Sequence, residues 1–159
     1  MMNRELVLRF CAFQQFSTEE YRRYPSLDSY LVEFTKRIDG RSDIGATFTD
    51  NELLRIGSEF DLAMTNASAL LEKAAFRRYS PNQTKRGPIN RAVFESQAVA
   101  LSRYELTQLL PYKSEITQAF RRLFEDDEYS RAVTVGTGDP RRVEVRLDRT
   151  AAALREIIK

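Results

Sequence analysis

The sequence predicts an all-α protein, a single compact multi-helix domain of about six to eight helices. Apolar residues recur at steps of three and four along most of the chain, which is the period of an α-helix. The 159 residues include only six Gly and five Pro, few for a β-sandwich or barrel that turns every ~8–12 residues. Hydrophobic residues make up 42%, enough for one packed core, so we expect residues 1–159 to form one domain.

The first third of the chain predicts two helices joined by a polar connector. Residues 4–16 are apolar around much of a helical circumference, Cys11 included, which is typical of a helix buried on several sides. Residues 17–25 form the connector. Ser26 is a suitable N-cap for the second helix, and Gly40 is a natural residue to follow its end. Residues 39–47 then predict a loop.

The clearest amphipathic helix follows Thr49. Thr49 and Glu52 have the spacing of a capping box, in which two side chains satisfy the free N–H groups of a helix start. Apolar residues continue from Leu53 to Ala74, so the helix has ~25 residues and spans roughly 38 Å.

The second half predicts further helices over residues 89–104, 106–110, 114–124, 126–133 and 141–158. Residues 77–88 lack an apolar period and contain two Pro and one Gly, so we expect an exposed loop. Residues 135–140 predict a turn in which Asp139 caps the last helix.

The composition narrows the possible chemistry. The chain has no His and one Cys, which removes the commonest general base, the commonest zinc ligand and an internal disulfide. No apolar run approaches the ~18–20 residues of a membrane span, and the start lacks the order of a signal peptide. We therefore expect a soluble cytoplasmic protein with no membrane partner, no metal and no cofactor.

A basic loop is the candidate binding site. Its cations are Arg77, Arg78, Lys85, Arg86 and Arg91, interleaved with Tyr79 and neutral polar residues. Arg and Lys in this setting suit sequence-independent contact with the phosphates of a nucleic acid. The alternative is a solvated loop whose cations pair with acidic neighbours, because the net charge of the whole chain is only +2. The sequence leaves both interpretations open.

Two other charge runs predict ordinary surface features. Arg142, Arg146 and Arg149 share one face of the last helix, which predicts a solvated outer face neutralised by Glu144 and Asp148. The four carboxylates of residues 125–128 lack the ligand spacing of a calcium loop, so we expect them to cap a helix rather than hold a metal. No local pattern pairs an acid with a base, so we expect no catalytic residues in this chain.

Three segments resemble a large prokaryotic family. The stretch RELVLRFCAF of residues 4–13, followed by LDSYL at 27–31, is similar to the first conserved stretch of that family. Residues 89–95, INRAVFE, resemble a second motif of the family. A third stretch, Ala132 to Thr137, is similar to the region near the family's terminal Gly-Thr turn. Members of the family carry an N-terminal ParB/sulfiredoxin-like domain with a DGQQR motif. They include the S half of GmrSD-type modification-dependent restriction enzymes and related phage-defence proteins.

The resemblance implies a role without catalysis. The nucleotide-handling DGQQR element of that family precedes the helical region, so we expect this chain to be a C-terminal piece of a larger protein or one half of a split system. Its apolar faces would pack on the ParB/sulfiredoxin-like half or on a second copy, and its basic loop would contact DNA. The alternative is an independent nucleic-acid-binding module that uses the basic loop of residues 77–91.

Overall fold

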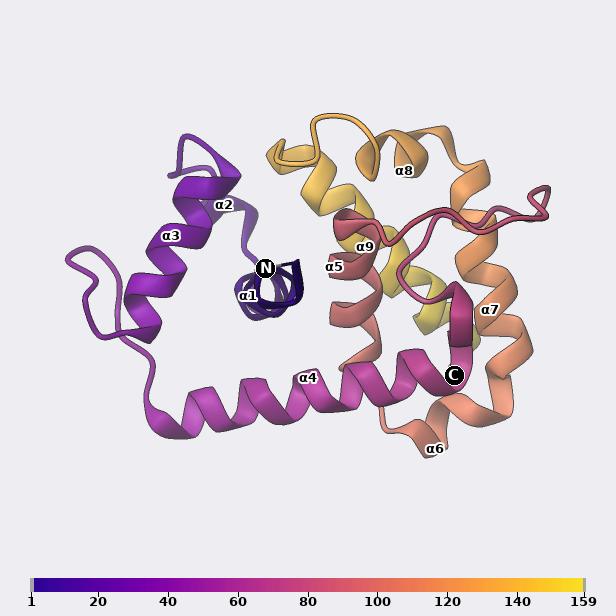
Figure 1. Ribbon diagram of the computed structural model, residues 1–159, viewed down its shortest axis with the longest axis horizontal. Coiled ribbons are helices and arrows are strands. Elements are labelled where there is room, and N and C mark those ends of the chain that lie inside the picture. Colours follow the sequence, from indigo (N-terminus) through magenta and orange to yellow (C-terminus); the bar gives the residue numbers. More distant parts are fainter. Residues whose placement is uncertain (1, 159) are drawn as a thin grey trace.

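The computed structural model describes residues 2–158 and confirms the all-α fold (Figure 1). The helices are α1 (Met2–Gln14), α2 (Thr18–Tyr21), α3 (Leu27–Ile38), α4 (Asp50–Leu71), α5 (Arg91–Leu101), α6 (Leu106–Leu109), α7 (Lys113–Arg122), α8 (Asp127–Ala132) and α9 (Pro140–Ile157). Short 3₁₀ turns follow α4, α6 and α7 at Glu72–Ala74, Leu110–Tyr112 and Leu123–Glu125. One isolated antiparallel bridge joins Arg77 to Ile89.

Helix α5 is the centre of the molecule. It lies between α1, α4 and α9, and every residue from Ala92 to Leu101 is buried (Figure 1). Its apolar residues contribute to all three hydrophobic clusters of the core. The same helix also buries Glu95, Ser96 and Gln97, so these polar groups need partners inside the core.

Helix α4 connects two parts of that core. Its 22 residues span roughly 33 Å along one side of the molecule (Figure 1). Ile56 and Ala63 belong to the cluster formed with α1 and α3, whereas Leu70 belongs to the cluster formed with α6, α7 and α9. Asn66, which is fully buried, donates from Nδ2 to the carbonyl oxygens of Leu101 and Tyr104 at 2.9 and 2.8 Å. It thereby satisfies acceptors at the end of α5.

The predicted helix caps are confirmed. Ser26, Thr49 and Asp139 each accept a bond from the backbone N–H three residues later, and Thr49 with Glu52 forms the full capping box. Gly40 adopts φ 68° directly after α3, where Arg41 N–H reaches the carbonyl of Lys36 at 2.8 Å.

The helix boundaries differ from the expectation most clearly at α2, α4 and α5, the last of which covers Arg91–Leu101 rather than residues 89–104. Residues 17–25 are not only a connector, because Thr18–Tyr21 form the short helix α2 and Tyr21 is buried. Helix α4 ends at Leu71 rather than Ala74, because Glu72 takes φ 52° and starts a 3₁₀ turn. Within residues 2–158, no helix combines the length and apolar character needed to cross a membrane.

Removing the cap of α4 should destabilise the protein measurably. Thr49→Ala leaves the N–H of Glu52 without its side-chain acceptor, and we expect a loss of about 1 kcal/mol in the free energy of unfolding, measured by urea denaturation. Thr47→Ala, in the exposed loop two residues earlier, is the control and should change stability by less than about 0.5 kcal/mol. Equal effects of the two substitutions would contradict the assigned cap.

Candidate functional site

A buried charge network joins three helices. Glu95 on α5 is fully buried and accepts from Arg9 Nη1 on α1 at 2.6 Å and from Arg146 Nη2 on α9. Arg9 also donates from Nε to Glu5 Oε1 at 2.9 Å. Burial lowers the pKa of Arg9, but the carboxylates of Glu95 and Glu5 outweigh this effect and raise it above its ordinary value. Arg9 therefore stays charged in the core.

Arg146 contradicts the predicted solvated face of α9, because its side chain is fully buried. Its Nη1 donates to the carbonyl oxygen of Thr137 at 2.7 Å, and its guanidinium carbon lies 5.7 Å from the ring centre of Phe13. Its position three residues after the buried Val143 and four before the buried Thr150 places it on the core-facing stripe. That spacing is visible in the sequence and indicates that Arg146 faces the core.

Polar groups continue the network beyond Glu95. Tyr129 on α8 is fully buried, and its hydroxyl lies 3.3 Å from Ser96 Oγ and 3.5 Å from Thr150 Oγ1. Burial raises the pKa of Tyr129, so the phenol remains protonated at neutral pH. Gln97 Oε1 accepts the backbone N–H of Phe76 at 2.8 Å. All three buried polar residues of the central helix thus have partners.

The family-like segments converge on this network. Arg9 belongs to the first segment, Glu95 ends the second, and Thr137, whose carbonyl binds Arg146, belongs to the third. Arg91, also in the second segment, pairs with Glu5 at 3.1 Å. Arg9 and Glu95, which form one of these ion pairs, are 86 residues apart along the chain, yet the segments share one set of contacts. The three segments therefore share polar contacts in the core of this structure.

Hydrogen bonds connect the two sides of the basic loop at its base and further out. At its base, the N–H of Asn90 donates to the carbonyl of Phe76 at 2.8 Å. Further out, Arg77 Nη1 donates to the carbonyl oxygen of Gly87 at 3.0 Å. The N–H of Gly87 donates to the carbonyl oxygen of Arg78, also at 3.0 Å. The loop extends away from the helical body beside α7 (Figure 1).

The five predicted cations fall into two groups. Arg77 is half-buried and bonded within the loop, and Arg91 pairs with Glu5 while its side chain stays 54% exposed. Of the five cations, Arg78, Lys85 and Arg86 are exposed and lack a carboxylate partner among residues 2–158. Residues 77–91 contain no Asp or Glu. The projecting part of the loop is therefore positively charged and open to solvent.

The other two charge runs pair with each other. Arg149 contacts Asp126 and Glu128 at 3.5 and 3.3 Å, and Arg141 contacts Glu128 at 3.4 Å. Asp126 Oδ1 also accepts from the N–H groups of Glu128 and Tyr129, so its predicted capping role is confirmed. Arg141 and Arg149 are thus paired with Asp126 and Glu128 rather than with Glu144 and Asp148, whereas Arg142 donates to the carbonyl oxygen of Val135.

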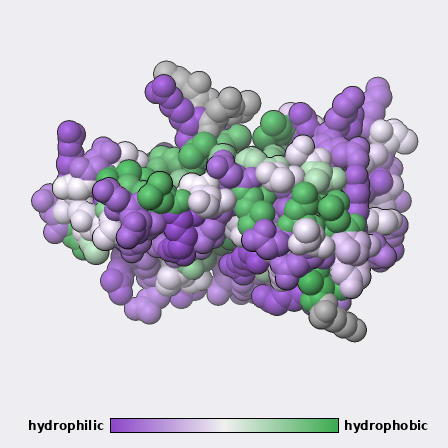
Figure 2. Space-filling view, turned by 90° about the horizontal axis from the view of Figure 1, so that it is seen from below, coloured by the Kyte–Doolittle hydropathy of each residue, from purple (hydrophilic) through white to green (hydrophobic). Residues whose placement is uncertain are grey.

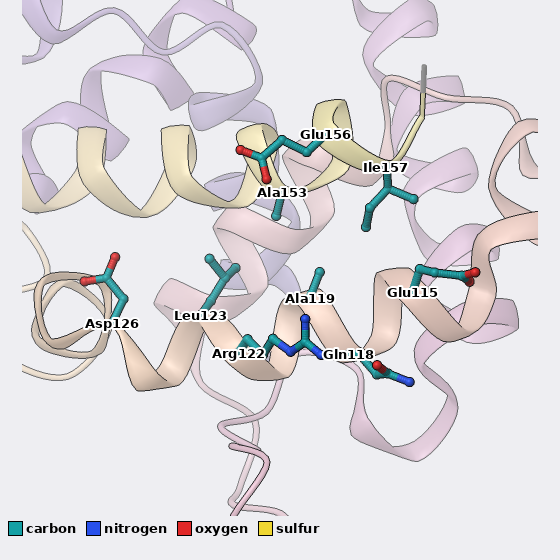
Figure 3. Close-up of a pocket in the computed structure, with 9 residues that line it drawn as sticks. All are labelled: Glu115, Gln118, Ala119, Arg122, Leu123, Asp126, Ala153, Glu156 and Ile157. Carbon is teal, nitrogen blue, oxygen red and sulfur yellow. The ribbon is translucent and has the colours of Figure 1, made fainter.

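An open groove of about 410 Å³ lies between α7 and α9 (Figure 3). Ala119, Leu123, Ala153 and Ile157 provide its apolar surface. Glu115 and Asp126 stand at opposite ends of the groove, so these carboxylates do not converge on one point (Figure 3). Elsewhere, Cys11 packs against the first hydrophobic cluster, and burial raises the pKa of its thiol. This disfavours the reactive thiolate.

Exposed hydrophobic residues are spread over many elements. The large ones are Val7, Val32, Ile44, Leu54, Ile89, Leu110, Tyr112 and Val135. In the view of Figure 2, hydrophobic patches alternate with hydrophilic side chains. Single apolar side chains at a surface are normal and do not by themselves mark an interface.

Comparison with models of protein families, with curated proteins and with solved structures finds no match to this chain.

Removing the charge of Glu95 should strongly destabilise the fold. Glu95→Gln keeps the shape of the side chain but leaves Arg9 and Arg146 buried without their shared carboxylate. We expect a loss of about 3–5 kcal/mol in the free energy of unfolding, measured by urea denaturation. The matched change Glu115→Gln at the exposed groove rim should cost less than about 0.5 kcal/mol. A loss below about 1 kcal/mol for Glu95→Gln would show that the network does not hold the helices together.

Proposed function

We propose that this chain is a non-catalytic helical domain of the ParB/sulfiredoxin-like restriction and phage-defence family, and that its basic loop binds the phosphate backbone of DNA. The observation that carries the DNA-binding role is the loop itself. It presents Arg78, Lys85 and Arg86 to solvent on a segment that contains no acidic residue. Cations on such a segment displace counterions from a nucleic acid without reading its sequence.

The buried network joins the segments on which the proposed family assignment rests. Segments that resemble the family at three separate places meet at Glu95 and its two arginines. Glu95 and Arg146 are fully enclosed and cannot contact a substrate without unfolding, so the proposal gives this network a structural role. In this proposal, nucleotide chemistry belongs to a ParB/sulfiredoxin-like half or to another partner protein.

Neutralising the loop should weaken DNA binding and its dependence on salt. For Arg78→Ala, Lys85→Ala and Arg86→Ala combined, we expect roughly a tenfold or larger loss of affinity for duplex DNA at low salt. The slope of log affinity against log salt concentration should fall in magnitude by about 3, because each lost phosphate contact contributes ~0.9. Fluorescence anisotropy across a salt series measures both quantities.

A control triple variant separates the loop from net charge. Arg22→Ala, Lys36→Ala and Arg41→Ala removes two Arg and one Lys from exposed positions around α3, on the opposite side of the view in Figure 1. It changes the net charge by the same amount and should keep the wild-type salt slope. If both triple variants lose affinity equally, binding reflects overall charge, and the role assigned to the loop is wrong.

The non-catalytic part of the proposal has its own test. Purified chain incubated with Mg²⁺ and a nucleoside triphosphate should release no phosphate above the buffer blank, because the proposal places hydrolysis on another polypeptide. Phosphate release that persists through purification and co-elutes with the folded chain would refute this part. The DNA-binding part would then still stand or fall on the salt series.

A further inference from the structure

One side chain of the helical body anchors the tip of the basic loop, which comprises residues 78–86. Arg121 on α7 donates from Nη2 to the carbonyl oxygens of Ser80 and Pro81 at 3.0 and 3.1 Å. Its guanidinium carbon lies 4.0 Å from the centre of the Tyr79 ring, a distance typical of a cation–π contact. Arg121 therefore contacts three consecutive residues of the loop.

The other contacts of the loop do not connect its tip to the body. Arg77 and Gly87 bond to each other inside the loop, and the side chain of Gln83 accepts from the N–H of Ser80 at 2.9 Å. Among residues 2–158, the hydrogen bonds between the helical body and segment 78–86 both come from Arg121. The orientation of the tip relative to the body thus depends on this residue.

We propose that Arg121 is the positioning residue of the DNA-binding loop, an inference that rests on the proposed function. By fixing residues 79–81 it holds Arg78, Lys85 and Arg86 in one arrangement before DNA arrives. A pre-ordered loop loses less conformational freedom on binding than a mobile one, and affinity rises accordingly. Arg121 acts through the loop, because its Nη2 and one face of its guanidinium are already engaged and its Nε is buried.

Lysine cannot replace Arg121 in this role. The planar guanidinium stacks on Tyr79 while it donates to two neighbouring carbonyl groups. A lysine ammonium is a compact charge on a flexible stem and lacks that combination of stacking and fixed geometry. Charge and positioning at residue 121 can therefore be separated by experiment.

The test compares Arg121→Lys, which keeps the charge, with Arg121→Met, which keeps much of the apolar stem. Arg122→Met is the matched control, an exposed neighbour on the same helix. Amide hydrogen exchange of segment 78–86 in the free protein should become roughly tenfold faster in both Arg121 variants and stay unchanged in the control. Affinity for duplex DNA should fall roughly three- to tenfold in both variants. The salt slope should keep its wild-type value, because the three exposed loop cations remain.

Three results would overturn the inference. Unchanged exchange in segment 78–86 would show that Arg121 does not anchor the loop. Full recovery of affinity in Arg121→Lys, with a smaller salt slope in Arg121→Met, would show that residue 121 contacts phosphate directly. If the wild-type chain binds no DNA, the proposed function fails and the positioning role falls with it, whereas faster exchange would still report the anchoring contact.

Discussion

The fold depends on one carboxylate, Glu95, placed in the core between two arginines. A buried charge is costly unless it is paired and hydrogen-bonded, and Glu95 meets this requirement with Arg9 and Arg146. Apolar side chains tolerate small shifts of one helix along another, but an ion pair at hydrogen-bonding distance does not. Glu95 therefore fixes α1 and α9 relative to the central helix α5. The surrounding clusters supply the burial that stabilises this arrangement.

The helices could largely be predicted from the sequence because their signals are local. A capping box needs only Thr49 and Glu52, and an amphipathic stripe needs only its own spacing. The buried network could not be predicted in the same way, because Glu95 lies 86 residues from Arg9 and 51 from Arg146. Periodicity identifies the apolar residues of α5 but says nothing about which polar residues find partners. Runs of charged residues are ambiguous for the same reason, because Arg146 is buried beside Glu95 whereas Arg149, on the same helix, is exposed beside Glu128.

The candidate site was predictable in composition but not in geometry. The cluster of basic residues in a loop without acidic neighbours is visible in the sequence. The sequence does not show that Arg77 is half-buried within the loop or that Arg91 contacts Glu5. It also does not show Arg121, which lies 40 residues beyond Pro81 and belongs to a helix with its own amphipathic pattern. The residues that carry charge and the residues that hold the loop come from different parts of the chain.

The loop and the buried network are attached to the same helix. The N–H of Phe76, where the chain enters the loop, donates to Gln97, two residues after Glu95 on α5. Where the chain leaves the loop, Asn90 caps α5 through Oδ1 and donates from Nδ2 to the carbonyl of Val133 at 2.9 Å. Phe76 adopts φ 62°, a conformation that residues other than glycine rarely take, so these contacts hold strained backbone in place. Helix α5 therefore gives the loop a defined base, and its buried polar residues Glu95, Ser96 and Gln97 each have a hydrogen-bond partner.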